Sequence, residues 1–165
     1  MEGKHVQESA VVMSMVMLPH QANVAGNVHG GEIMKLMDNA AYVVAHRHAR
    51  ANVVTARVDE LTFHHPIMVG NLVICHAYLT FVGNSSMEVA VVVEVEDLYK
   101  ESSRICALTA YFTMVALNAG GHPMRVPPLH LDNEEEHIEF EEGQKRYEAN
   151  KNREKKCFVP RYYRI

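Results

Sequence analysis

The stretch EIMKLMDNAAYVVAHRHA, residues Glu32 to Ala49, decides the fold of this 165-residue chain. It consists mainly of good helix formers and contains neither Gly nor Pro, which predicts a helix of about five turns. Its apolar side chains cover almost the whole circumference of that helix. A helix at the protein surface normally shows a single apolar stripe. We therefore expect a mostly buried helix.

Apolar segments typical of strands lie on both sides of this helix. Residues 11–18 form a continuous apolar run that ends at Pro19, which cannot donate a hydrogen bond to a sheet. Four longer segments rich in β-branched and aromatic residues follow the helix. They are residues 53–63, 72–82, 87–98 and 104–117.

The connections between the later strands are short. The linker from His65-Pro66 to Gly70-Asn71 and the linker Gly83-Asn84-Ser85-Ser86 predict two antiparallel hairpins, which join the second, third and fourth strands. One strand, one buried helix and four strands predict an α+β fold in which an antiparallel sheet wraps around the helix. This element order is that of the hotdog fold.

The C-terminal segment differs in composition from the rest. Residues 1–130 are interpreted as one domain, and residues 131–165 as a charged helix and tail. A solvated helix is predicted over residues 132–156. Its first half is acidic and its second half is basic, in the order that favours a helix dipole.

Bulk properties narrow the function classes. The net charge is -4, so a broad nucleic-acid-binding surface is not expected, although a local anion site remains possible. Residues 1–10 do not resemble a signal peptide, and no segment reaches the roughly 20 apolar residues of a membrane span. A cytoplasmic protein is expected. The eleven histidines lack zinc-ligand spacing, so no metal site is expected, and three cysteines argue against a disulfide framework.

Asp38 is the sole Asp of the predicted helix and has apolar neighbours in the sequence. A carboxylate in apolar surroundings is costly unless it has partners, and in a cleft it is a candidate nucleophile or general base. The alternative is a structural carboxylate that backbone N–H groups or a neighbouring subunit satisfy. Helical periodicity fits both interpretations equally.

The loop from Asn23 to Gly31 precedes the helix N-terminus, where free N–H groups favour negative charge. Because Gly30 and Gly31 lack side chains, a substrate carbonyl could approach these N–H groups as in an oxyanion hole. The alternative is an ordinary Gly-rich turn. Asp38 lies seven residues beyond Gly31, roughly 10 Å along a helix, so a dimer could be needed to unite the two.

Three segments carry a family resemblance: ANVAGNVHGGEIMKLMDNAA from Ala22, VTARVDELTFHHPIMVGNLV from Val54, and YFTMVALN from Tyr111. Together they resemble the cytosolic acyl-CoA hydrolase branch of hotdog thioesterases. The resemblance covers about residues 15–128. Its specific features are GNVHGG, an acid nine residues after the His of that motif, and the F-x-x-P-x-x-x-G pattern that starts at Phe63.

The resemblance implies hydrolysis of fatty acyl-CoA at a site between subunits, in a homo-oligomer that is often a trimer of dimers, a homohexamer. No cofactor is implied, because CoA would be part of the substrate and product. By position, Asp38 matches the catalytic acid and Asn23 the Asn that holds water or substrate. His29 and Gly30 match residues that flank the thioester carbonyl. Asp38 could activate water or attack the carbonyl itself.

Further substrate contacts are implied at the second linker. Gly83, Asn84, Ser85 and Ser86 resemble a segment that contacts CoA, although many relatives carry Arg where this chain has Asn84. Ordinary turn chemistry is the alternative for both serines. His64 could line the acyl or pantetheine channel or lie in a solvated turn. The rival functions are a hotdog hydratase or dehydratase and a non-catalytic acyl-CoA sensor.

Overall fold

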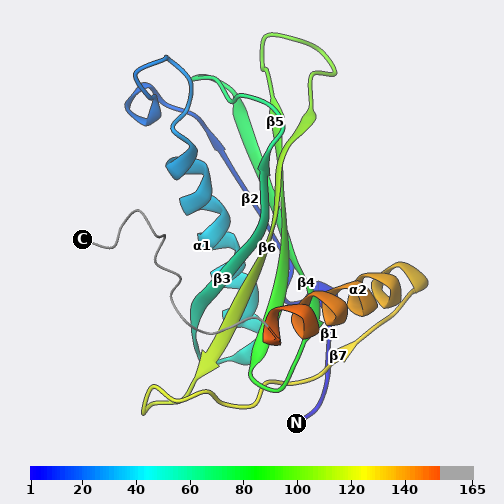
Figure 1. Cartoon of the computed structure of the whole chain (residues 1–165). Coiled ribbons are helices and arrows are strands. Elements are labelled where there is room, and N and C mark those ends of the chain that lie inside the picture. Colours follow the sequence, from blue (N-terminus) through cyan, green and yellow to red (C-terminus); the bar gives the residue numbers. More distant parts are fainter. Residues whose placement is uncertain (153–165) are drawn as a thin grey trace.

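A computed structural model describes residues 1–152 of the chain. It contains one five-stranded sheet, one two-stranded sheet and two α-helices (Figure 1). The strands are β1 (Lys4–His5), β2 (Val11–Val16), β3 (Asn52–Phe63), β4 (Leu72–Val82), β5 (Ser86–Glu96), β6 (Ile105–Leu117) and β7 (Leu129–His130). The helices are α1 (Gly30–Ala49) and α2 (Glu134–Lys151), with short 3-10 turns at Val6–Glu8 and Pro19–Gln21.

The large sheet has the strand order β2-β4-β5-β6-β3, and its neighbouring strands are antiparallel. The predicted hairpin at residues 83–86 is confirmed, because β4 and β5 pair on either side of it. The predicted hairpin between β3 and β4 is wrong, since β3 pairs with β6 at the far edge. The linker instead crosses the end of the sheet, where Ile67 accepts a hydrogen bond from Val28 and Gly70 donates one to Met17.

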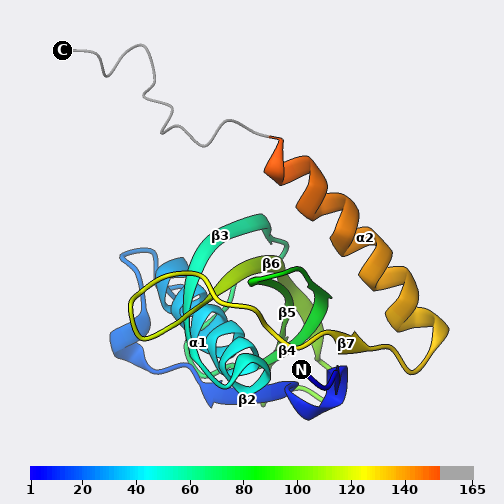
Figure 2. The ribbon, with the colours of Figure 1, turned by 90° about the horizontal axis from the view of Figure 1, so that it is seen from below.

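Helix α1 lies along one face of this sheet, and the strands curve around it (Figures 1 and 2). Met37, Ala40, Ala41 and Val44 are fully buried against the sheet. Burial of a Val or Met side chain stabilises a fold by about 1.5–3 kcal/mol, so this face anchors the helix. The α+β fold class and the central helix are as the sequence predicts.

The opposite face of α1 is open, so the prediction of a mostly buried helix holds for only half of its circumference. Met34, Tyr42 and Asn39 are exposed on this face. The edge strand β3 beside it also exposes the apolar residues Val54 and Val58. The apolar residues that made the helix look buried are thus divided between the core and an uncovered surface.

Helix α2 packs on the face of the sheet that is turned away from α1 (Figure 2). The expectation of a solvated helix is therefore wrong for one of its faces. Gly143 is buried, and a Cβ atom there would lie 2.7 Å from Cβ of Phe81. The rings of Phe140 and Tyr147 contact the Phe81 ring, and their centroids lie 5.0 and 5.3 Å, respectively, from the Phe81 centroid. Residues 153–156 of the predicted helix lie outside the described part.

An ion pair between the half-buried Arg146 and the buried Glu88 fixes α2 to the sheet. Arg146 donates to Glu88 at 2.8 Å, and Thr80 donates to the same carboxylate at 2.7 Å. The guanidinium carbon lies 3.8 Å from the centroid of the Tyr111 ring. Because each charge is compensated, the helix can bury these polar groups on an otherwise apolar face. Within residues 1–152, no helix is long and apolar enough to cross a membrane.

His48 in the last turn of α1 makes the stability depend on pH. The side chain is fully buried, its Nε2 lies 2.8 Å from the Pro127 carbonyl oxygen, and Nδ1 has no partner among the described residues. Burial lowers the pKa of His48 below its ordinary value of 6.5, and the hydrogen bond to Pro127 only partly opposes this. The folded state therefore favours the neutral imidazole.

Because the unfolded chain takes up this proton more readily, stability is full above about pH 6.5 and is lost as the pH falls through the folded-state pKa. We expect the free energy of unfolding, measured by urea titration, to decrease between pH 7 and pH 5. His48→Gln should weaken this decrease, whereas His46→Gln at an exposed position should leave it unchanged. An equal pH dependence in both variants would contradict the assignment to His48.

Candidate active site

Asp38 is half-buried on the open face of α1, one turn from each of the exposed residues Met34 and Tyr42. Its Oδ1 accepts a hydrogen bond from Oγ1 of Thr55 at 2.6 Å. Thr55 lies on β3, next to a bulge between Thr55 and Arg57 that shifts the pairing with β6. The apolar surroundings expected for Asp38 are found only in part, because Thr55 provides a polar partner.

Thr55 was not predicted from the sequence as a site residue. The available signal was weak: one hydroxyl between Val54 and Ala56 in a strand of otherwise ordinary composition. Thr is common in strands, so composition alone does not distinguish a polar contact from a good strand former. Its contact with Asp38 depends on the packing of α1 against β3.

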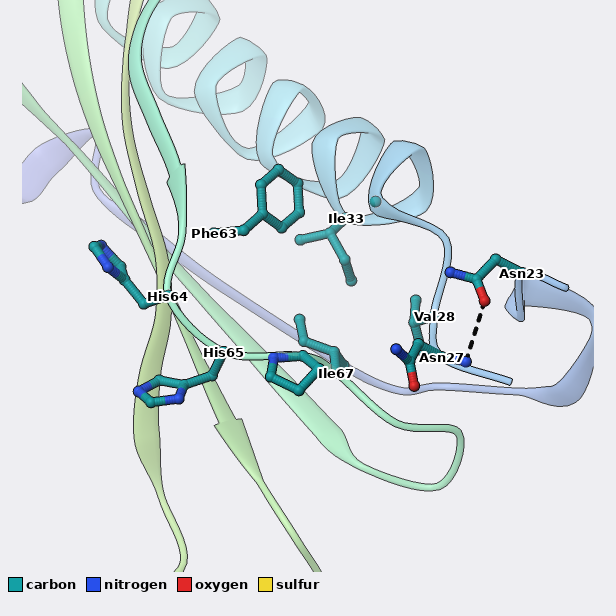
Figure 3. A pocket seen from close by; sticks show the side chains of 10 residues that line it. Asn23, Asn27, Val28, Ile33, Phe63, His64, His65 and Ile67 are labelled. Carbon is teal, nitrogen blue, oxygen red and sulfur yellow. Dashed lines mark hydrogen bonds between the residues drawn. The ribbon is translucent and has the colours of Figure 1, made fainter. Parts of the chain in front are cut away.

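The loop before α1 is held by its own hydrogen bonds. Asn23 Oδ1 accepts from the N–H group of Ala25 at 2.9 Å. It also accepts from the N–H group of Asn27 at 3.3 Å (Figure 3). The Asn23 N–H donates to the Asn27 carbonyl oxygen at 2.7 Å. The amide nitrogen Nδ2 of Asn23 has no hydrogen-bond partner within residues 1–152 and remains able to donate. The Asn23 side chain thus combines a turn contact with a free donor.

His29 caps the N-terminus of α1. Its Nδ1 accepts a hydrogen bond from the Gly31 N–H at 2.9 Å, so this donor is occupied. Of the two N–H groups expected to polarise a carbonyl, that of Gly30 has no partner among the described residues. A Cβ on Gly30 would lie 3.1 Å from Cζ of Phe63, so a larger residue would be crowded there. The absence of a side chain keeps this N–H accessible.

A cavity of about 250 Å³ lies between this loop and the segment after β3. Asn23, Asn27, Gly30 and Phe63 are among its lining residues. Phe63 points toward Ile33 of α1, whereas the rings of His64 and His65, which also line the cavity, extend to the other side of the strand (Figure 3). The structure therefore brings Asn23, Gly30 and the His64 segment together.

Two predicted parts of the site, Asp38 and the Gly83–Ser86 turn, lie away from this cavity. Asp38 does not line this cavity. The Gly83–Ser86 turn lies at the other end of the sheet from the loop (Figure 1). Its backbone is engaged: Gly83 donates to Ser86, while Ser85 and Asn84 accept from Ala116 and Val126. Within residues 1–152, no cluster of three or more His, Cys, Asp or Glu side chains could hold a metal ion.

The chain is similar to a known protein family and to named relatives. Residues 25–102 match the family model described as the thioesterase superfamily. The chain is 44% identical over 130 residues to the mouse cytosolic acyl coenzyme A thioester hydrolase, a match that covers 78% of this chain and 34% of the relative. It therefore spans about a third of that relative's length.

Relatives of similar length match over nearly the whole chain. The uncharacterised acyl-CoA thioester hydrolase YkhA of Bacillus subtilis is 36% identical over 154 residues, 93% of this chain and 89% of the relative. The crystal structure of an apo hexameric acyl-CoA thioesterase superposes with a TM-score of 0.86 and 30% identity. That superposition covers 92% of this chain and 96% of the other.

An antiparallel sheet wrapped around one long helix is the hotdog fold, which the hexameric thioesterase structure shares. The mouse and Bacillus subtilis relatives are both named acyl-CoA thioester hydrolases. The chain belongs to the acyl-CoA thioester hydrolase family of the thioesterase superfamily.

Proposed function

We propose that the protein hydrolyses fatty acyl-CoA to a free fatty acid and CoA, with Asp38 as its principal catalytic residue. The observation that carries this proposal is the contact between Asp38 and Thr55. The hydroxyl of Thr55 orients the carboxylate through Oδ1, which leaves Oδ2 available for a water molecule or a substrate. An ionised carboxylate only accepts hydrogen bonds, so Oδ2 can accept one from a water molecule.

In the general-base form of the reaction, Asp38 takes a proton from water as the water oxygen attacks the thioester carbonyl carbon. The carbon–sulfur bond of the tetrahedral intermediate then breaks, and the CoA thiolate leaves and is protonated. In the nucleophilic form, the carboxylate first attacks the carbonyl carbon, the carbon–sulfur bond breaks as the CoA thiolate leaves, and water then hydrolyses the resulting mixed anhydride. The proposed site provides the same groups for both forms.

The negative charge on the carbonyl oxygen would be stabilised by the Gly30 N–H. This donor lies at the start of α1, where the helix dipole adds its positive end. His29 supports the arrangement by capping Gly31, which fixes the first turn of the helix. Asn23 would hold the water or the carbonyl through its free Nδ2. His64, whose ring extends away from the loop, is proposed as a further substrate contact.

The active site is proposed to form between two copies of the chain. Asp38 lies beside the uncovered edge of β3, and the apolar side chains of Met34, Tyr42, Val54 and Val58 around it need a partner. A two-fold pairing along this edge would let Asp38 of one copy face the loop of the other. By analogy with the hexameric relative, the assembly is proposed to be a trimer of dimers. It is proposed to act in the cytosol, because the name of the mouse relative describes that protein as cytosolic.

The test is thiol release from acyl-CoAs of short to long chain by the full-length protein. The proposal requires turnover of at least one fatty acyl-CoA, in an oligomer verified by light scattering. If the protein binds these thioesters in calorimetry but releases no thiol, it is a sensor. If it instead hydrates an enoyl-CoA without thiol release, the hydratase alternative is correct.

A further inference from the structure

Another cavity, of about 520 Å³, lies between the end of α2 and the face of the sheet that is turned away from α1. Its floor includes Arg57 of β3 together with Thr113 and Val115 of β6, and its side includes Tyr147 and Lys151 of α2. Arg57 lies opposite Thr113 in the strand pairing, so the floor is continuous from β3 to β6. We call this cavity the α2 groove.

The lining of the α2 groove is more apolar than polar, and most of its charged side chains are compensated. Phe81 and Tyr147 are in ring contact and form an aromatic wall. Nε of Arg57 donates to both carboxylate oxygens of Asp59 at 2.7 Å. The Glu88 carboxylate is compensated by its ion pair with α2. The groove therefore suits a large apolar side chain better than a charged group.

Residues 153–165 of the chain begin at the edge of this groove. Asn150 in the last turn of α2 lines it, and Nδ2 of Asn150 donates to Oδ2 of Asp59 on β3 at 2.9 Å. This contact fixes the end of the helix beside the groove. An extended chain spans up to about 3.3–3.6 Å per residue, so Phe158, eight positions beyond Asn150, can reach the whole groove.

The composition of residues 153–165 suits a segment that binds there. The segment contains five Lys or Arg residues and one Glu, whereas the net charge of the whole chain is -4. The rest of the chain is therefore acidic and attracts the segment. An aromatic side chain buries a large apolar area, which makes it a good anchor for an aromatic wall. The large apolar residues of the segment are Phe158, Val159, Tyr162, Tyr163 and Ile165.

We propose that residues 153–165 bind in the α2 groove of their own chain, with the Phe158 side chain against the aromatic wall. The bound segment covers Arg57, at the bulge of β3 that follows Thr55. It lies on the opposite face of this strand from the contact between Thr55 and Asp38. The docking does not depend on acyl-CoA hydrolysis, and its tests need no thioester.

The first test traps the bound segment through Cys157, the residue before Phe158. Cys106 is replaced by Ser, and Cys75 is inert because burial raises the pKa of its thiol to about 12. In this background, Thr113→Cys places a thiol in the floor of the groove. Mild oxidation of the full-length protein should link this thiol to Cys157 of the same chain.

Thr109→Cys in the same background is the matched control. Thr109 lies on the same strand and the same face as Thr113, but Tyr111 lies between them with Arg146 stacked over its ring. Its disulfide with Cys157 should form about tenfold more slowly, because the effective concentration of the two thiols is lower. Equal rates, or disulfides mainly between two chains, would overturn the proposal, and mass spectrometry of the non-reduced peptides distinguishes these outcomes.

Trypsin cleavage after Arg161 tests the chain without added cysteines. The bound segment exposes this bond only when it detaches, so the cleavage rate follows the detached fraction. Phe158→Ser removes the apolar anchor and should accelerate cleavage about tenfold. Lys155→Ser, which alters a charged residue before the anchor, should leave the rate after Arg161 unchanged. Equal rates in the wild-type chain and Phe158→Ser would contradict the docking.

Discussion

Replacing Asp38 by Asn is expected to lower kcat for acyl-CoA hydrolysis by about 10²- to 10⁴-fold, the contribution typical of a positioned general base. The amide keeps the shape of the side chain and can still accept from Thr55, but it cannot take a proton from water or form an anhydride. KM should change little, because the open cavity near Asn23 and Gly30 does not include Asp38. The measurement is thiol release under saturating acyl-CoA.

Glu101→Gln is the matched control for this variant. It makes the same carboxylate-to-amide change in an exposed turn between β5 and β6, so kcat should stay at the wild-type value. Both proteins must show the wild-type oligomer size and melting temperature. If Asp38→Asn retains wild-type turnover under these conditions, Asp38 is structural and the catalytic assignment is wrong.

Removing Arg146 is expected to have the largest effect on stability. Arg146→Ala leaves the Glu88 carboxylate buried with only Thr80 as a partner, which should lower the free energy of unfolding by about 3–5 kcal/mol. The measurement is urea denaturation at neutral pH and at matched protein concentration, because oligomer stability depends on concentration.

A surface ion pair provides the comparison. Nη2 of Arg104 lies 3.1 Å from Oε2 of Glu96, but both side chains are partly exposed. Arg104→Ala should therefore lower the free energy of unfolding by only about 0.2–1 kcal/mol. The double variant Glu88→Leu/Arg146→Met, which removes both buried charges, should recover much of the stability lost in Arg146→Ala. If Arg146→Ala costs no more than Arg104→Ala, the ion pair does not anchor α2.

The fold could be predicted from the sequence because its elements have strong local signals. The long Gly- and Pro-free segment before Arg50 gives α1, and the alternating apolar segments give the strands with boundaries close to those observed. The position of β3 could not be predicted this way. A linker of this length permits either a hairpin or a crossing, and the hydrogen bonds of Ile67 and Gly70 that fix the crossing involve distant segments.

The same distinction applies to the candidate site. Asp38 and the loop before α1 are recognisable, because a carboxylate in an apolar helix and paired glycines before a helix are visible in sequence. Thr55 is not, since its role follows from contact between α1 and β3. The engagement of the Gly31 N–H by His29 depends on one side-chain rotamer, which sequence patterns do not specify.

Long-range charge pairing also explains why the docking of α2 on the sheet could not be predicted from the sequence. The charge order of α2 matches a helix dipole and predicts a solvated helix. Its docking depends on Arg146 meeting Glu88 on β5, 58 residues away, and on the missing side chain of Gly143. Arg146 is one of several cations in a highly charged segment, so its sequence position does not single it out.

The central claim is that Asp38 of one subunit works with the Asn23–Gly31 loop of another, and complementation tests it most directly. Asp38→Asn and Asn23→Ala are each expected to be nearly inactive alone. In co-expressed mixtures about half of the dimers are hybrids with one intact site, so about a quarter of the wild-type thiol release should return. If hybrid oligomers form, as native mass spectrometry would show, and activity stays at the level of the separate variants, the shared active site is contradicted.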